Sequence, residues 1–426
     1  MHMNSKILIL GGKPIATMDI VDCAQKKNMY VIVTDYLPCS DSPAKQIADE
    51  YWDISTDQTE IIANKVVEQK IMGIFSGVHE FNIEKAMQIC DITGLPFYAT
   101  KEQFEMLMDK KSFKRLCRNQ DIPVVQEYHS VDPMDREFYQ NLKYPVLLKP
   151  NDNSGGRGIR ICYAPKEFPS MYKDSLGFSK SQQVLIERYM KNEEATIFYI
   201  LQDGEIRLTA MGDRHIQHFK DGVIPLPVAY TFPSKYLDEY EKNLNDKVIE
   251  MFRSLGMKNG MVFIQSFIED GKCVFYEMGY RITGSLEYKL INHCCGFDPL
   301  DMMIEQAVYG RSNVDLDKLV NPHFPRPYCN ITFLIMPGTI GKIEGVEAIR
   351  SMPNIIDVVL SYKEGDTIPQ TSLGTLQQVV ARVFAYAETE SQLADLMDDV
   401  HRRFDVLSDN GASMLLPVFN TNYLRS

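Results

Sequence analysis

The stretch Leu147–Arg160, "LLKPNDNSGGRGIR", is a short apolar run followed by a loop with little side-chain bulk. The residues on both sides predict two strands, and Pro150 keeps the chain extended at the end of the first. Three glycines lie in the loop (Gly155, Gly156 and Gly158), where backbone N–H groups can approach phosphate oxygens and positive φ is tolerated. A strand follows the loop, whereas a Walker P-loop opens a helix. The stretch therefore predicts a hairpin loop that either covers phosphates as a flap or is only an exposed turn.

Lysines on the neighbouring elements carry charge suited to the same role. The pattern "TKEQFEMLMDKKSFKRLCRNQDIPV" predicts one long helix that ends at Pro123, and it contains Lys110 and Lys111. Lys149 ends the first strand of the hairpin. An ammonium group is a compact point charge that can reach a phosphate, although a single lysine is more often solvated at the surface. Taken together, the lysines favour the flap interpretation of the loop.

The stretch "LIERYM" ends another expected strand with Glu187 and continues to Met190. A carboxylate followed by backbone groups at a free strand edge can bind the amino group and a ring nitrogen of adenine. On its own the motif is more often a plain strand end.

The first hundred residues alternate strands and helices, which predicts a parallel sheet with right-handed crossovers. The turn "GGKPIA" lacks the G-x-G-x-x-G spacing, so it indicates a tight turn rather than a dinucleotide site. The expected strands are Lys6–Leu10, Met29–Asp35, Gly73–Phe75 and one near Phe97, and the later helices are Thr59–Gln69 and Glu80–Thr93.

The segments "GMVFIQSFI" and "CVFYEMGYR" predict a hairpin with a three-residue turn at Glu269–Gly271. In that register Phe275 lies opposite Gln265, and Glu277 is a diagonal neighbour of Gln265. Strict alternation puts Glu277, Gly279 and Arg281 on one face, and Tyr276, Met278 and Tyr280 on the other. A carboxylate and a guanidinium on one strand face form either an ion pair or a metal ligand beside an anion clamp.

Further polar residues are candidates for binding a substrate. "MGDRHIQHFKDG" contains Arg214, His215, His218 and Lys220, which either form a basic wall or are solvated charges between strands. After Arg281, the small residues of "TGSLEYK" let a ligand approach the backbone, and the candidates there are Gly284, Ser285 and Glu287.

Composition limits the classes of partner. A chain of 426 residues predicts two to four domains. The net charge of −12 argues against a nucleic acid or an anionic membrane as the main partner. No stretch approaches the roughly 18–20 apolar residues of a membrane span. The nine cysteines show no CxxC spacing, so free thiols in a reducing cytoplasm are expected.

The order of these motifs resembles that of the ATP-grasp superfamily, in the branch with biotin carboxylase, the carbamoyl-phosphate synthetase halves and the L-amino acid ligases. The resemblance covers almost the whole chain. It rests on "DKKSFK", "PVLLKP" with "NSGGRGIR", "LIERYM", a hairpin that ends in an acid, and "YRITGS". The tail, with "PGTIGKIEGVEAI" and "SYKEGDTIP", is similar to the C-terminal domain of the amino acid ligases.

The resemblance implies an α/β protein with the ATP-grasp fold. Its parts would be a Rossmann-like parallel-sheet (pre-ATP-grasp) domain over 1–100, an ATP-grasp domain over 101–320 with a small lid at about 125–190, and an α+β domain over 321–426. The implied activity is ATP-dependent ligation of a small carboxylic acid to an amine through an acyl phosphate, with release of ADP and phosphate. The alternatives are a bicarbonate-using carboxylase and a nucleotide-binding protein with little turnover. A cytoplasmic homodimer is expected.

The resemblance also assigns residues. It implies that Lys110 and Lys149 contact the phosphates of ATP, that Arg281 and Lys149 act in catalysis, and that Glu277 and Gln265 hold Mg²⁺. The other implied ATP contacts are the flap Ser154, Gly155, Gly156, Arg157 and Gly158, the adenine contacts Glu187, Arg188, Tyr189 and Met190, and Glu194 at the ribose. The implied substrate contacts are Arg214, His218, Gly284, Ser285 and Glu287.

The chain departs from the family's E-x-N-x-R pattern at two metal positions. Gly279 stands where relatives have an Asn, and Gln265 stands where they have an acid. Three interpretations follow: phosphates and water complete the metal shell of a working ligase, an acid such as Asp213 or Asp270 replaces the missing one, or the chemistry has been lost.

Overall fold

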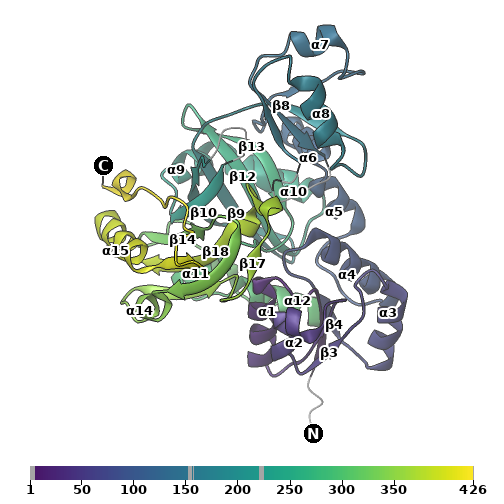
Figure 1. The fold of residues 1–426 in the computed structure, drawn as a ribbon. Coiled ribbons are helices and arrows are strands. Elements are labelled where there is room, and N and C mark those ends of the chain that lie inside the picture. The colour runs from purple at the N-terminus through teal and green to yellow at the C-terminus, as the bar shows by residue number, and fades with distance from the viewer. Residues whose placement is uncertain (1–4, 152–155, 157, 220–224, 426) are drawn as a thin grey trace.

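The computed structural model describes residues 5–151, 156, 158–219 and 225–425. Within these ranges the chain forms four β-sheets with helices around them (Figure 1). No helix in the described part is both long and apolar enough to cross a membrane.

The N-terminal part is a parallel sheet with the strand order β3-β2-β1-β4. Its strands are β1 (Lys6–Leu10), β2 (Tyr30–Thr34), β3 (Glu50–Trp52) and β4 (Gly73–Phe75), and its helices are α1 (Ile15–Lys26), α2 (Pro43–Ile47), α3 (Thr59–Glu68) and α4 (Glu80–Thr93). The parallel sheet is confirmed. The expected strand near Phe97 is wrong, because no strand forms there and the sheet ends at β4; the edge strand β3 was not expected.

Both faces of this sheet are buried, which explains the continuous apolar run of β1. Ile7 and Ile9 pack in one cluster with α1 and α12 (Pro299–Tyr309), whereas Leu8 and Leu10 pack with α3 and α4. Helix α12 comes from much later in the chain. It approaches β4 at Gly73, where a side chain would collide with the backbone of Ala307.

The expected long helix before Pro123 is two helices, α5 (Lys101–Met108) and α6 (Lys110–Asn119). Asp109 interrupts them because its extended backbone and its carboxylate, which accepts a hydrogen bond from the Ser112 N–H at 2.8 Å, start a new helix. The break fixes Lys110 at the first position of α6.

The upper lobe in Figure 1 is a small antiparallel sheet with the order β5-β8-β6-β7, and we call it the lid. It consists of β5 (Glu127–Tyr128), β6 (Val146–Pro150), β7 (Arg160–Cys162), β8 (Val184–Arg188), α7 (Arg136–Gln140) and α8 (Phe168–Leu176). As predicted, β6 and β7 are the two strands around the glycine loop. The two described loop glycines, Gly156 and Gly158, have φ of 80° and 79°.

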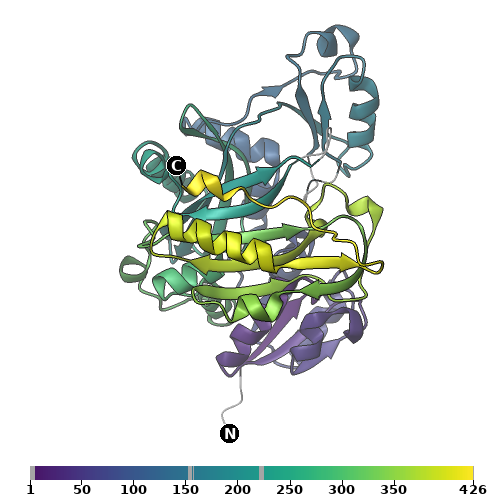
Figure 2. The same cartoon turned by 60° about the vertical axis from the view of Figure 1, so that its left-hand side comes forward.

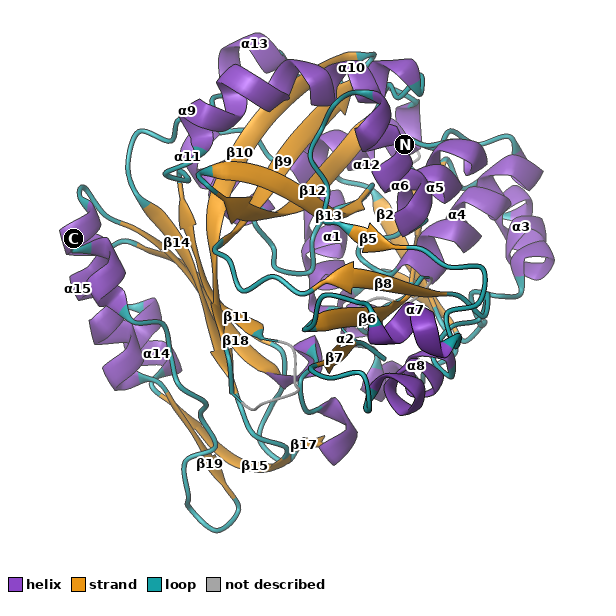
Figure 3. Ribbon diagram, turned by 90° about the horizontal axis from the view of Figure 1, so that it is seen from above, coloured by secondary structure: helices purple, strands orange, loops and turns teal. Residues whose placement is uncertain are grey.

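The largest sheet has eight antiparallel strands in the order β13-β12-β9-β10-β11-β14-β18-β16. They are β9 (Glu194–Gln202), β10 (Glu205–Gln217), β11 (Leu226–Phe232), β12 (Gly260–Glu269), β13 (Lys272–Gly279), β14 (Tyr328–Leu334), β16 (Ile355–Leu360) and β18 (Val379–Tyr386). Figure 3 shows this sheet and the lid sheet as separate sets of strands. Because β11 pairs with β14, the sheet runs without a break from the middle of the chain into its C-terminal part.

The C-terminal strands are covered on both faces. Residues of α15 pack on one face of β14 and β18, and residues of α11 pack on the other. Figure 2 shows α15, in yellow, lying across these strands. The remaining elements are α9 (Leu237–Tyr240), a π-helix (Glu241–Asn245), α10 (Asp246–Ser254), α11 (Tyr288–Cys295), α13 (Leu316–Leu319), α14 (Val346–Arg350), α15 (Glu390–Arg403) and the strands β15 (Gly338–Glu344), β17 (Thr367–Ile368) and β19 (Asp405–Ser408).

The β12–β13 hairpin differs from the expected register. Its turn has two residues, Asp270 and Gly271, both with positive φ, because Glu269 pairs with Lys272. A β-bulge then changes the register so that Gln265 lies directly opposite Glu277 rather than diagonal to it. Tyr276 is the extra residue of the bulge, so it lines the same cavity as Glu277 instead of the opposite face.

Candidate functional site

Two connected cavities lie on one face of the large sheet. The lid-side cavity, of about 210 Å³, lies between the lid and the β12–β13 hairpin. The tail-side cavity, of about 250 Å³, lies between the hairpin, the start of α1 and the C-terminal strands. The two share the side chains of Arg214, Phe263, Gln265, Arg281 and Leu376. A ligand that occupies both would therefore pass Gln265 and the two arginines.

Two lysines surround one carboxylate at the lid-side cavity. Lys149 Nζ lies 3.3 Å from Glu277 Oε2 and 5.6 Å from the ring centroid of Tyr276. Burial alone would raise the pKa of Glu277, but Lys149 and then Lys110 outweigh it and lower the pKa to about 2. Burial lowers the pKa of Lys110, which also donates to the Asn151 carbonyl at 3.3 Å. The excess of positive charge at this point suits an anionic ligand.

Lys110 itself faces a third and larger cavity of about 850 Å³ between α4, α5 and the lid. Glu277 lines this cavity as well as the lid-side cavity. Most of the other expected residues line the two smaller cavities, so size alone does not identify the site.

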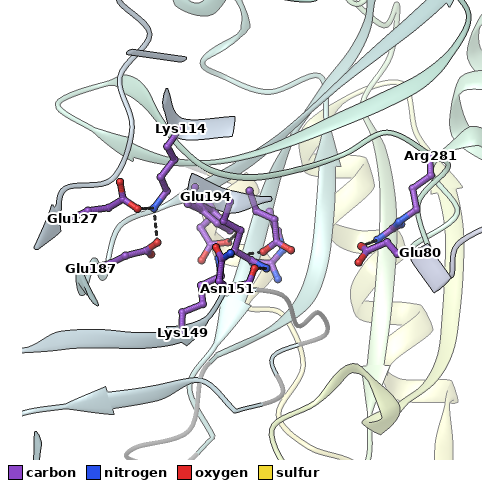
Figure 4. Close-up of polar contacts among 12 residues, drawn as sticks. Glu80, Lys114, Glu127, Lys149, Asn151, Glu187, Glu194 and Arg281 are labelled. Carbon is purple, nitrogen blue, oxygen red and sulfur yellow. Dashed lines mark hydrogen bonds and ion pairs between the residues drawn. The ribbon is translucent and has the colours of Figure 1, made fainter. Parts of the chain in front are cut away.

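The Glu187 carboxylate is engaged within the protein. It forms a buried ion pair with Lys114, and Lys114 Nζ also lies 3.5 Å from Glu127 Oε1 (Figure 4). In contrast, the backbone N–H and C=O of Met190 make no hydrogen bond to any residue that the structure describes. Of the expected backbone contacts to adenine, the N–H groups of Arg188 and Tyr189 donate to the carbonyls of Gln126 and Pro145, so Met190 supplies the open groups. The Glu187 carboxylate has a structural partner that the sequence did not reveal.

Glu194 and Arg214 were expected to contact different ligands, but they contact each other. They are directly opposite on β9 and β10 and form an ion pair, and Tyr276 donates a hydrogen bond to Glu194 Oε2 at 2.9 Å. Burial alone would lower the pKa of Arg214, but the Glu194 charge raises it well above its usual value. The pair is a fixed part of the wall between the two cavities.

Arg281 links the hairpin to the N-terminal sheet. Its guanidinium lies 3.2 Å from Glu80 Oε1 at the start of α4 (Figure 4) and 5.0 Å from the ring of Phe263. Its buried Nε makes no hydrogen bond to a described residue. The guanidinium thus keeps a donor for a ligand at the junction of the cavities.

Gly156, Arg188 and Tyr189 line the lid-side cavity, and other expected residues fall into three groups. Gly284 and Ser285 line the tail-side cavity. Glu287 is fully buried and accepts a hydrogen bond from Thr283, and His218 is exposed after β10, so neither lines the two cavities. Ser154, Gly155, Arg157 and Lys220 lie outside the described residues.

The metal positions fit one ion better than two. Glu277 and Gln265 face each other, but the Phe263 ring occupies the space into which a side chain at Gly279 would extend. In the described part of the chain, the groups of three acidic, His or Cys side chains close enough to hold an ion lie elsewhere. A carboxylate and an amide oxygen, completed by water and phosphate oxygens, are a set that Mg²⁺ accepts.

Neither acid suggested as a replacement lies at these positions. Asp270 is in the hairpin turn at the far end of β12 and β13. Asp213 points away from the cavities that Arg214 lines, because neighbouring strand residues face opposite sides, and it accepts a hydrogen bond from Ser234 Oγ at 2.5 Å.

Sequence reasoning missed several residues of the site. Lys114 lies one helical turn after Lys110, a spacing that places both on one face of α6. Arg382 lines the tail-side cavity from β18, and a single charge inside the apolar run "VVARVFAY" was its signal in the sequence. Glu80 and Thr196 gave no signal, because their position depends on contacts between distant parts of the chain.

Two family models match parts of the chain. Residues 109–310 match the ATP-binding domain of the carbamoyl-phosphate synthase L chain, and residues 332–406 match L-amino acid ligase C-terminal domain 2. The C-terminal section of the carbamoyl phosphate synthase large chain of Methanocaldococcus jannaschii is 20% identical over 377 residues, which cover 83% of this chain. The match spans 58% of that relative's length.

Solved structures share the fold over nearly the whole chain. The L-amino acid ligase from Bacillus licheniformis has a TM-score of 0.77 at 14% identity, covering 96% of this chain and 100% of that one. The biotin carboxylase domain of the Hydrogenobacter thermophilus 2-oxoglutarate carboxylase, solved with MgADP and bicarbonate, has a TM-score of 0.77 at 18% identity, covering 97% and 92%.

The environment of Asp213 predicts a pH-dependent effect of one substitution. Burial raises the pKa of Asp213 to about 6, whereas an aspartate in an unfolded chain titrates near pH ~3.9. As the pH rises toward 6, the unfolded chain has already ionised this carboxyl group, whereas in the native state ionisation must overcome the cost of burial. The contribution of Asp213 to the free energy of unfolding is therefore lost as the pH rises through 6. Asp213→Asn should therefore gain stability over the wild type by on the order of 1–3 kcal/mol between pH ~4 and pH ~8. Urea unfolding at both pH values measures the difference, and a pH-independent difference would contradict it.

The contact between Gly279 and Phe263 predicts a coupled effect on stability. Gly279→Ala should lower the free energy of unfolding by about 1–3 kcal/mol, because the added Cβ overlaps the Phe263 ring. In a Phe263→Leu background the same change should cost much less. Gly284→Ala is the matched control, since its Cβ would meet open space. Equal losses in both backgrounds would show that the ring does not exclude a side chain at Gly279.

Proposed function

Because the chain belongs to the ATP-grasp superfamily, we propose that it is an ATP-dependent ligase that joins a carboxylic acid to an amine. The observation that carries the proposal is the pair of connected cavities, with Lys149 and Glu277 in one and Arg281 at their junction. Relatives named carbamoyl phosphate synthase and L-amino acid ligase support the class of reaction. A MgADP complex of the related biotin carboxylase domain supports ATP with Mg²⁺ as the nucleotide.

In this proposal ATP lies in the lid-side cavity. The open backbone groups of Met190 bind the adenine edge, and Gly156 lines the same cavity. Lys149 neutralises phosphate oxygens there, and Lys110 neutralises those that reach past Glu277 toward the third cavity. Glu277 and the Gln265 carbonyl oxygen hold one Mg²⁺, which supplies further positive charge at the phosphates. Phosphoryl transfer needs mainly such positioning and neutralisation.

The acid lies in the tail-side cavity with its carboxylate at Arg281. A carboxylate oxygen attacks the γ-phosphorus and ADP leaves, which gives an acyl phosphate. The amine nitrogen then attacks the carbonyl carbon, phosphate leaves, and the nitrogen loses a proton. Arg281 keeps the reacting carboxylate next to the phosphate in the first step and neutralises charge in the second.

A bicarbonate-using carboxylase is the nearest alternative. Bicarbonate would leave most of the tail-side cavity empty, since that cavity has about 250 Å³. The assembly we propose is a homodimer, as in the related biotin carboxylase domain, whose structure is that of a dimer.

The activity is tested by screening ADP release with paired carboxylic acids and amines. We expect release to require both partners, and hydroxylamine to trap the acyl phosphate as a hydroxamate when the acid is present alone. Arg281→Ala should lower hydroxamate formation by about a hundredfold or more, because the reacting carboxylate loses its guanidinium. Arg253→Ala, an exposed arginine on α10, is the matched control. Unchanged hydroxamate formation in Arg281→Ala would overturn its role, and release with bicarbonate alone would favour the carboxylase.

The proposed metal site is tested by supplying the missing acid. Gln265→Glu places a second carboxylate opposite Glu277, so the Mg²⁺ concentration for half-maximal ADP release should fall on the order of tenfold. Gln265→Asn, which keeps a neutral amide, should not lower it. An unchanged Mg²⁺ requirement in Gln265→Glu would show that position 265 does not contact the ion.

A further inference from the structure

Arg382 is a buried guanidinium that forms no ion pair with an acidic residue in the part of the chain that the structure describes. It lies in the middle of β18, its residue is 6% exposed, and its side chain lines the tail-side cavity. Its one hydrogen bond within the described residues goes to Thr332 Oγ1 at 2.7 Å. A guanidinium carries five N–H donors, so most of its donors have no described acceptor. Leaving a buried charge unpaired is costly, so this guanidinium is suited to bind an anionic group that enters the cavity.

The other two arginines of the cavity each have an acidic partner within the protein. Arg214 is paired with Glu194, and Arg281 is paired with Glu80. Among the described carboxylates, Glu287 is the one whose charge acts favourably on Arg382, but it accepts its hydrogen bond from Thr283 and forms no ion pair with the guanidinium. Of the three arginines that line this cavity, Arg382 is therefore the one that has no ion-pair partner among the described residues.

The rest of the cavity wall fits a small molecule with a short apolar body. Ile15, Val359 and Val379 are apolar, whereas Ser361 and Thr196 add hydroxyl groups. The Thr196 hydroxyl is buried and has no hydrogen-bond partner in the described part of the chain. A volume of about 250 Å³ lies below the roughly 300–1,000 Å³ typical of pockets for drug-sized ligands.

We propose that Arg382 binds a carboxylate of the substrate that does not react. This inference rests on the proposed ligase activity, in which Arg281 holds the reacting carboxylate where the two cavities meet. Arg382 is contributed by a different strand of the same cavity, so a substrate that spans it presents a second anionic group there. That group is either a second carboxylate of the acid or the carboxylate of an amino acid that serves as the amine, and the chemistry of recognition is the same for both.

The expected effect follows from the strength of a charged hydrogen bond. Bonds between a guanidinium and a carboxylate contribute enough for about a 10- to 100-fold preference over a ligand that lacks the carboxylate. The preference should disappear in Arg382→Gln and persist in part in Arg382→Lys, which keeps the charge but not the planar fork.

Calorimetric titration without ATP separates the two sources. One arm compares succinate and longer dicarboxylates with the matched monocarboxylates, and the other compares amino acids with amines of the same length. A preference for the carboxylate-bearing ligand that Arg382→Gln removes supports the proposal, and the arm in which it occurs identifies the source. No preference in either arm, or a preference that remains in Arg382→Gln, overturns it. Arg326→Gln, a surface arginine of the same tail that pairs with Glu388, is the matched control.

Two further measurements keep the outcome decisive. Arg382→Gln should unfold at the same or a higher urea concentration than the wild type, because it removes an unpaired buried charge. A lower midpoint of urea unfolding, together with no preference for carboxylate-bearing ligands in Arg382→Lys, would mean that Arg382 has a structural role and would overturn the proposal. ADP release is measured with the same ligands. If ADP release is absent while the Arg382-dependent preference remains, the proposed ligase activity is wrong and the anion site stands. If ADP release occurs and Arg382→Gln alters neither the release nor the binding preference, the ligase activity stands and the anion site is wrong.

Discussion

The arrangement of the site depends on one carboxylate enclosed by lysines where the lid meets the large sheet. Glu277 is ionised because Lys149 and Lys110 are close, and Lys149 keeps its charge although it is buried because Glu277 is close. The three groups come from β13, β6 and α6. The attraction between the Glu277 carboxylate and the two ammonium groups therefore holds three parts of the chain together. A negatively charged ligand with its own cation can enter such a cluster without leaving any of the three charges unpaired.

Much of the fold could be predicted from local pattern. The apolar run of β1 indicated a strand buried on both faces, and β4 and α4 have the expected bounds because their periodicity and flanking residues agree. The glycine hairpin was predictable because its loop requires backbone conformations that glycine favours. The break at Asp109 was missed because one capping side chain outweighed a helical periodicity that continues on both sides, and the segment at Phe97 forms no strand although its composition resembles one.

The site was predictable where its chemistry is carried by neighbours in sequence, and it was not predictable where it depends on register. Glu277, Gly279 and Arg281 could be identified as a group. The bulge that aligns Glu277 with Gln265 and turns Tyr276 to the same side is a property of two strands together. Pairs such as Glu80 with Arg281, and the exposure of Arg382 to the tail-side cavity, join residues that are far apart along the chain. The partner of Glu187 in Lys114 likewise needs the lid and α6 to be placed in contact.

Both cavities lie against the unbroken eight-stranded sheet, but different parts of the chain complete their walls. Strands of that sheet supply about half of the described residues that line the tail-side cavity, and the lid supplies none of them. The lid has its own sheet and its own apolar cluster, and it supplies Leu147, Lys149 and Glu187 to the wall of the lid-side cavity. A change of side chain on β16 or β18 can therefore alter the wall of the tail-side cavity without replacing a residue that lines the lid-side cavity.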